Sequence, residues 1–89
     1  MRDKIAAVYD YLRTEFRHSE IEDFQDPVRK AQTFKIKESQ LSRTLFIKWD
    51  FLERNTANAI PDVLGSFLLA EHIREYALPI VVTPSGLSD

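Results

Sequence analysis

The segment "TLFIKWDFL", Thr44–Leu52, decides the fold because its apolar residues alternate with other residues along its length. Alternation with a period of two is typical of a β-strand, whose successive side chains point to opposite faces of a sheet. One predicted face is wholly apolar and belongs in a core: Leu45, Ile47, Trp49 and Phe51. The opposite predicted face is mixed: Thr44, Phe46, Lys48, Asp50 and Leu52. The sequence therefore raises the question of what covers Phe46 and Leu52.

A second strand precedes this segment. In "QTFKIKES", residues 32–39, Phe34 and Ile36 are predicted to face the core. The residues between and beside them are predicted to face outward: Thr33, Lys35 and Lys37. We predict an antiparallel hairpin of residues 33–38 and 44–52. Residues 19–26 predict a short, irregular edge strand that ends at the turn signal Asp26-Pro27.

Helices are predicted on both sides of this hairpin. Residues 3–16 carry an apolar stripe at helical spacing: Ile5, Val8, Tyr9, Leu12 and Phe16. A second helix is predicted to start near Pro61 and to run to about Tyr76, followed by a short apolar strand at 80–82. The order α-β-β-β-α-β predicts a single α+β domain over residues 1–89, a two-layer sandwich. Its sheet is mainly antiparallel, with both helices on one face.

The second predicted helix carries two apolar stripes instead of one. Ile60, Val63, Leu64 and Phe67 lie on one side of a helical projection, and Leu69, Ile73, Tyr76 and Ala77 lie on nearly the opposite side. A helix that is apolar over most of its girth is buried on several sides. One small chain has few other elements that could cover such a helix. Its second apolar stripe therefore also predicts contact with another molecule.

These surplus apolar residues predict a protein interface. The candidate interface residues are Phe46, Leu52, Leu68, Leu69 and Ile73. We expect a homo-oligomer, most simply a homodimer, or a complex with a protein or peptide partner. The alternative is that the segment 21–24 or the C-terminal tail covers Phe46 and Leu52 within one chain.

Charge is unevenly distributed along the chain. The net charge is −2, but residues 29–54 hold seven basic and three acidic residues between two acidic ends. A basic, partly aromatic sheet face predicts a second function, weak binding of single-stranded nucleic acid. Its candidate residues are Lys35, Lys37, Arg43, Phe46 and Lys48, with Arg43 placed in the hairpin loop. The alternative is a structural role, in which acidic helices of the same chain or of a second copy offset a basic sheet face.

The order of elements resembles that of two known families. It resembles the double-stranded-RNA-binding domain, although "AIPDVLGSF", residues 59–67, lacks the basic residues with which that family begins its last helix. It also resembles small acidic secretion-chaperone-like domains, which are α-β-β-β-α-β dimers that bind other chains. This second resemblance implies the same class of function as the surplus apolar surface.

Catalytic and metal-binding patterns are weak. Glu71, His72 and Glu75 share one helical region, but they lack a third ligand at a recognisable spacing. The chain has no cysteine and two histidines, and it has no nucleophile elbow or glycine-rich phosphate loop. We therefore expect no enzymatic activity, no cofactor and no metal. The N-terminal residues lack the apolar stretch of a secretory signal, so we expect a cytoplasmic, non-membrane protein.

Overall fold

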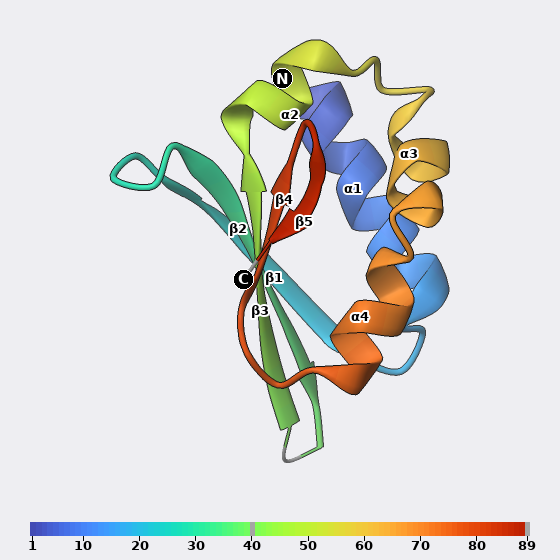
Figure 1. The fold of residues 1–89 in the computed structure, drawn as a ribbon. Helices are drawn as coiled ribbons and strands as arrows, with labels where there is room; N and C mark the ends of the chain where they lie inside the picture. The colour runs from blue at the N-terminus through green and yellow to red at the C-terminus, as the bar shows by residue number, and fades with distance from the viewer. Residues whose placement is uncertain (40, 89) are drawn as a thin grey trace.

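A five-stranded sheet and a layer of helices make up residues 1–39 and 41–88, the residues that this computed structural model describes (Figure 1). The helices are α1 (Arg2–Glu15), α2 (Trp49–Arg54), α3 (Ile60–Ser66) and α4 (Leu69–Glu75). The strands are β1 (Glu20–Asp26), β2 (Ala31–Glu38), β3 (Leu41–Lys48), β4 (Ile80–Thr83) and β5 (Gly86–Ser88). None of the described helices combines the length and the apolar character that crossing a bilayer requires.

The strands lie side by side in chain order, β1-β2-β3-β4-β5. Antiparallel pairing joins every neighbouring pair except β3 and β4, which are parallel. A parallel pair needs a long crossover connection, and here α2, α3 and α4 form it. The predicted α+β class with a mainly antiparallel sheet is confirmed. The predicted edge strand at 19–26 is also present as β1, whereas β5 was not predicted.

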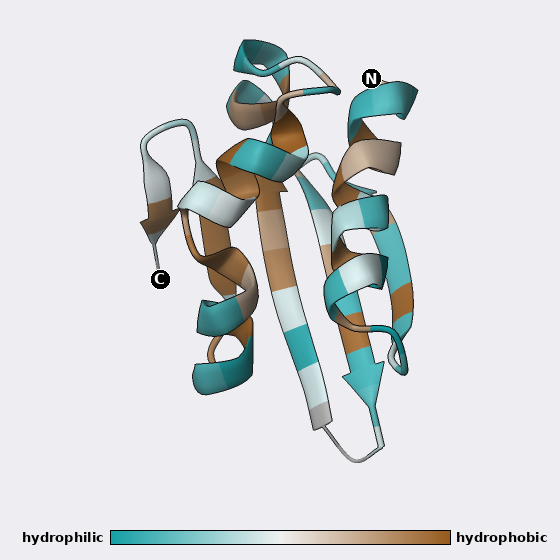
Figure 2. Cartoon of the chain, turned by 90° about the vertical axis from the view of Figure 1, so that its right-hand side faces the viewer, coloured by the Kyte–Doolittle hydropathy of each residue, from teal (hydrophilic) through white to brown (hydrophobic). Residues whose placement is uncertain are grey.

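The core lies between the sheet and the helical layer. Figure 2 looks onto this layer, in which α1, α3 and α4 cover one face of the sheet. The sheet buries a set of apolar side chains on that face: Phe34, Ile36, Leu45, Ile47, Ile80 and Val82. The helices bury the residues that meet them: Val8, Leu12, Phe51, Leu52, Ile60, Leu64, Leu69, Ala70 and Ile73. The opposite face of the sheet carries no helix from the described residues.

The segment Thr44–Leu52 is a strand only as far as Lys48. Lys48 pairs with Ala31, the first residue of β2, so the sheet offers no further partner beyond this point. The Trp49 N–H instead bonds to the Lys30 carbonyl oxygen at 2.9 Å, and the chain continues as α2. The prediction of an extended 49–52 is therefore wrong. Phe51 and Leu52 are both buried on the same side, which adjacent residues of a strand cannot achieve.

The second predicted helix is two helices. Leu68 adopts the left-handed conformation, with φ 57° and ψ 40°, between α3 and α4. Its N–H bonds to the Gly65 carbonyl oxygen at 3.0 Å, and its own carbonyl oxygen accepts the His72 N–H at 3.1 Å. Because the break changes the direction of the chain, both short helices bury apolar residues in the core: Ile60 and Leu64 of α3, and Leu69 and Ile73 of α4. Tyr76 and Ala77 lie beyond α4 and are exposed. The two stripes therefore do not require a second molecule.

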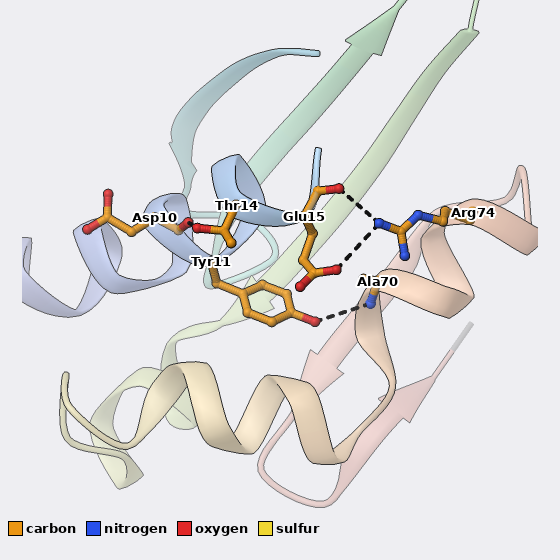
Figure 3. Close-up of polar contacts among 6 residues, drawn as sticks. All are labelled: Asp10, Tyr11, Thr14, Glu15, Ala70 and Arg74. Carbon is orange, nitrogen blue, oxygen red and sulfur yellow. Dashed lines mark hydrogen bonds and ion pairs between the residues drawn. The ribbon is translucent and has the colours of Figure 1, made fainter. Parts of the chain in front are cut away.

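Polar contacts join α1 to α4 across the helical layer (Figure 3). The Ala70 N–H lies in the first turn of α4, where no carbonyl of that helix is available, and it donates to the Tyr11 hydroxyl at 3.3 Å. Burial raises the pKa of Tyr11 above its usual range. The Arg74 guanidinium donates to the Glu15 carbonyl oxygen at 2.8 Å and lies 4.9 Å from the centre of the Phe16 ring. These contacts hold the end of α1 against α4.

The break at Leu68 predicts the sign of a glycine substitution. A left-handed residue with a side chain costs roughly 1 kcal/mol, which glycine avoids, so Leu68→Gly should raise the free energy of unfolding by up to about 1 kcal/mol. In a continuous helix the same change would lower it by about 1 kcal/mol. Urea unfolding followed by circular dichroism measures the difference. A loss of stability in Leu68→Gly would contradict the broken helix.

Candidate interaction surface

The sheet face that points away from the helices carries a row of side chains across all its strands. We call this the open face. Register places five residues of the row side by side: Phe24, Thr33, Phe46, Val81 and Ser88. Phe24 is 47% exposed, whereas Thr33 is buried because it lies between its cross-strand neighbours Phe24 and Phe46. Aromatic and apolar residues therefore run along the centre of an uncovered sheet.

A groove crosses one end of the open face. The turn 27–30 forms one bank and projects to the side opposite the helices, at the left in Figure 1. The connection from α4 to β4 forms the other bank. The groove has a volume of about 590 Å³ and is lined by Val28, Arg29, Lys30, Phe46, Lys48, Leu78, Pro79 and Val81. Val28 and Leu78 are 92% and 72% exposed, which is unusual for aliphatic side chains that flank one hollow.

Hydrogen bonds hold the turn 27–30 in place. Asp26 accepts the Arg29 N–H at 3.2 Å with one carboxylate oxygen and pairs with the Arg29 guanidinium at 3.0 Å with the other. These contacts, led by the backbone hydrogen bond, lower the pKa of Asp26 below its usual range. The Lys48 ammonium donates to the Arg29 carbonyl oxygen at 2.5 Å. The bank of the groove is therefore tied to both β1 and β3.

Cations lie over both aromatic rings of the open face. The Arg29 guanidinium carbon is 4.7 Å from the centre of the Phe46 ring, and the Lys35 ammonium is 5.8 Å from the centre of the Phe24 ring. Contacts of this kind contribute about 0.5–1 kcal/mol at exposed sites. The groove thus has an apolar floor and a basic rim, and none of the acidic residues that the structure describes lines it.

The structure separates the predicted interface residues. Phe46 lies in the groove, and Leu68 is 52% exposed at the break between α3 and α4, on the helical side of the molecule. The other three are core residues, with exposures of 1% for Leu52, 0% for Leu69 and 2% for Ile73. The premise that these three lack a partner within the chain is wrong. Alternation and helical projection could not reveal this, because both assumed straight elements.

The structure also separates the residues that were predicted to bind nucleic acid. Lys35, Lys37 and Lys48 share the open face with Phe46, as their register requires. Lys37, however, pairs with Glu22 at 3.2 Å. Arg43 is part of β3 instead of a loop, and its side chain turns to the helical side, where it donates to the Ile73 carbonyl oxygen at 3.1 Å. Arg43 therefore does not belong to the basic face.

Sequence reasoning missed six of the eight groove residues: Val28, Arg29, Lys30, Leu78, Pro79 and Val81. All but Val81 lie in connections, which carry no periodic signal. The available sign was Val28, an aliphatic residue within a charged turn, because turns favour Gly, Pro, Asn, Asp and Ser.

The weak metal-binding pattern of Glu71, His72 and Glu75 has no further ligands beside it among the described residues. His72 Nδ1 lies 3.0 Å from the carbonyl oxygen of Leu68, the N-cap residue of the same helix. Across the described part of the chain, no cluster of three or more His, Cys, Asp or Glu residues could hold a metal ion.

Comparison with known proteins adds no assignment, because no family model, curated protein or solved structure matches this chain.

Truncation of a phenylalanine side chain should lower the free energy of unfolding by unequal amounts on the two faces of β2 and β3. Phe34→Ala removes a fully buried ring and should lower the free energy of unfolding by about 3–5 kcal/mol. Phe46→Ala should lower it by about 1 kcal/mol, chiefly through the lost contact with Arg29. Urea unfolding followed by Trp49 fluorescence compares the two. Equal losses would mean that Phe46 is part of a core.

The Asp26 contacts predict a pH dependence of the turn. The pKa of Asp26 is lowered on folding. The contribution of the Asp26 carboxylate to the stability of the folded state is therefore complete above the pKa of the unfolded protein, and it is lost as the pH falls through the pKa of the folded protein. NMR titration should find the Asp26 midpoint lower in the folded protein than in the urea-unfolded protein, with the Arg29 amide shifting at the same midpoint. A midpoint equal to or above the unfolded value would contradict the hydrogen-bonded turn.

Proposed function

We propose that this protein is a non-enzymatic protein-interaction module that binds another polypeptide through its open face. The observation that carries the proposal is the groove between the turn 27–30 and the segment before β4. Two highly exposed aliphatic residues, Val28 and Leu78, flank it, and Phe46 and Val81 form its floor. Exposed apolar patches of this kind are typical of interaction sites.

The extent of the apolar row favours a polypeptide as the partner. An antiparallel sheet with one solvated face usually carries polar residues on that face. Here the apolar row continues beyond the groove, from Val81 and Phe46 in its floor to Phe24 on the edge strand β1. A small molecule would cover the groove alone, whereas a chain laid across the strands would cover the whole row.

A second copy of the chain is one form of this proposal. In the homodimer, the open faces of two copies would pack against each other and bury both apolar rows. Three of the five residues predicted to form a dimer interface, Leu52, Leu69 and Ile73, are buried within one chain. They therefore cannot contact a second copy. A partner of different sequence is therefore the form that we favour.

Single-stranded nucleic acid is the second candidate partner. It is favoured by one observation, that Phe24, Phe46 and Lys35 lie together on the open face. Two observations weigh against it. The Arg29 guanidinium already covers the Phe46 ring, where a base would stack, and Glu20 and Glu22 share the same face.

Selection from a displayed random-peptide library should recover peptides that bind the wild-type protein through the open face. Such peptides should lose binding to Val28→Asp and to Leu78→Asp, because a carboxylate would enter the apolar flanks of the groove. Both side chains are exposed, so neither change should disturb the fold. Leu68→Asp is the matched control, since it places the same charge on an exposed leucine of the helical side.

The outcomes of this selection are distinct. Peptides that lose binding only to the two groove variants support the proposal. Peptides that are equally sensitive to Leu68→Asp, or a selection that enriches none, contradict it.

Light scattering at two protein concentrations tests the homodimer. If a dimer forms through the open face, Val28→Asp and Leu78→Asp should give a folded monomer, whereas Leu68→Asp should leave the dimer intact. A wild-type monomer would exclude this form of the proposal. A fluorescent oligothymidine titrated at rising salt tests the nucleic-acid candidate, which requires an affinity that falls steeply with salt.

A further inference from the structure

We infer that the groove selects an acidic polypeptide segment that inserts an apolar side chain. This inference rests on the proposed function, because it names the partner of the same surface. It is carried by the composition of the groove, which within residues 1–39 and 41–88 is lined by five apolar residues and three basic ones, and by no acidic residue.

The basic rim is only partly neutralised within the chain. Arg29 pairs with Asp26 at 3.0 Å. No ion pair joins Lys30 or Lys48 to a carboxylate within the described residues. The remaining guanidinium N–H groups and the two ammonium groups therefore present an excess of positive charge at the rim. Complementary charge on the partner would steer its approach and fix its register.

The position of Arg29 is preorganised for a carboxylate. Asp26 holds the guanidinium on one side, and the Phe46 ring supports it from below at 4.7 Å. The Arg29 backbone is also held, because its N–H bonds to Asp26 and its carbonyl oxygen accepts the Lys48 ammonium. A side chain that is already ordered loses little conformational entropy when it binds, which strengthens each hydrogen bond to the partner.

The apolar part of the groove suits a single anchoring side chain. Val28 and Leu78 rise on opposite banks, and Phe46 and Val81 lie between them. A leucine or phenylalanine side chain placed there would contact Val28, Leu78 and Val81, beside the Arg29 guanidinium that covers the Phe46 ring. It would remove from water Val28 and Leu78, the most exposed of the large apolar residues that the structure describes. The volume of about 590 Å³ leaves room for the anchor and for flanking backbone.

An extended segment fits this site better than a small amphiphile such as a fatty acid. The groove has two banks and is open along the sheet face, so it cannot enclose a small ligand on all sides. Small-ligand sites usually bury most of the surface of their ligand. A segment that leaves the groove along the open face would continue over Thr33 toward Phe24.

Fluorescence anisotropy with three labelled hexapeptides tests the inference. The acidic peptide is Glu-Glu-Leu-Phe-Glu-Glu, and its counterparts replace every glutamate by serine or by lysine. We expect the acidic peptide to bind about tenfold more tightly than the serine peptide, with the difference shrinking as salt rises. We expect the lysine peptide not to bind. Equal binding of the acidic and serine peptides would overturn the charge selection.

Charge reversal locates the site. Lys30→Glu should weaken binding of the acidic peptide about tenfold, since Lys30 lines the groove with an exposed side chain. Lys35→Glu is the matched control on the same face but outside the groove, and it should weaken binding less. Val28→Asp should abolish binding, because the new carboxylate would lie beside the apolar anchor of the peptide. An equal effect of Lys30→Glu and Lys35→Glu would overturn the assignment to the groove.

The failure of this inference differs from the failure of the proposed function. If the peptides selected from the random library bind the open face but are not acidic, the inference is wrong and the interaction surface stands. If dodecanoate competes with the acidic peptide at equal concentration, the groove takes a small amphiphile and the inference is also overturned. If no peptide of any charge binds, both proposals are wrong.

Discussion

The pairing of β2 with β3 is the constraint on which the rest of the structure depends. Its register aligns Phe34 with Leu45 and Thr33 with Phe46, so it decides which side chains share each face. One face becomes strongly apolar and must be covered, and all the larger helices lie on that side. The same register sends Phe46, Lys35 and Lys48 to the other side. The open face is thus a direct consequence of how the core is covered.

The end of this pairing also positions the groove. Ala31 is the first residue of β2, and the turn before it lies beside the last residue of β3. Lys48 holds that turn through the Arg29 carbonyl oxygen, and Trp49 holds it through the Lys30 carbonyl oxygen. The point at which β3 becomes α2 is therefore also the point at which the bank of the groove is fixed. A rigid scaffold that positions loops in this way is a common arrangement for binding sites.

The sequence predicted the sheet better than it predicted the helices. Alternation over residues 33–38 and 44–48 assigned the correct faces, because a period of two is strict wherever a strand is paired on a buried sheet. The same alternation continued by coincidence through "WDFL", residues 49–52, which is too short to distinguish a strand from a helical turn. The two stripes of residues 60–77 were real, but a left-handed residue at Leu68 explains them without a second molecule.

By itself the sequence determined the α+β class, the faces of the central hairpin, and the basic, partly aromatic character of the outer face. Each of these follows from local periodicity or from composition. The tertiary structure alone decided that Leu52, Leu69 and Ile73 belong to the core, and that Arg43 turns toward the helices. It also decided that Val28 and Leu78, fifty residues apart in the sequence, flank one groove. The physical reason is that a helix break, a strand end and two connections set these positions, and none of them has a periodic signal.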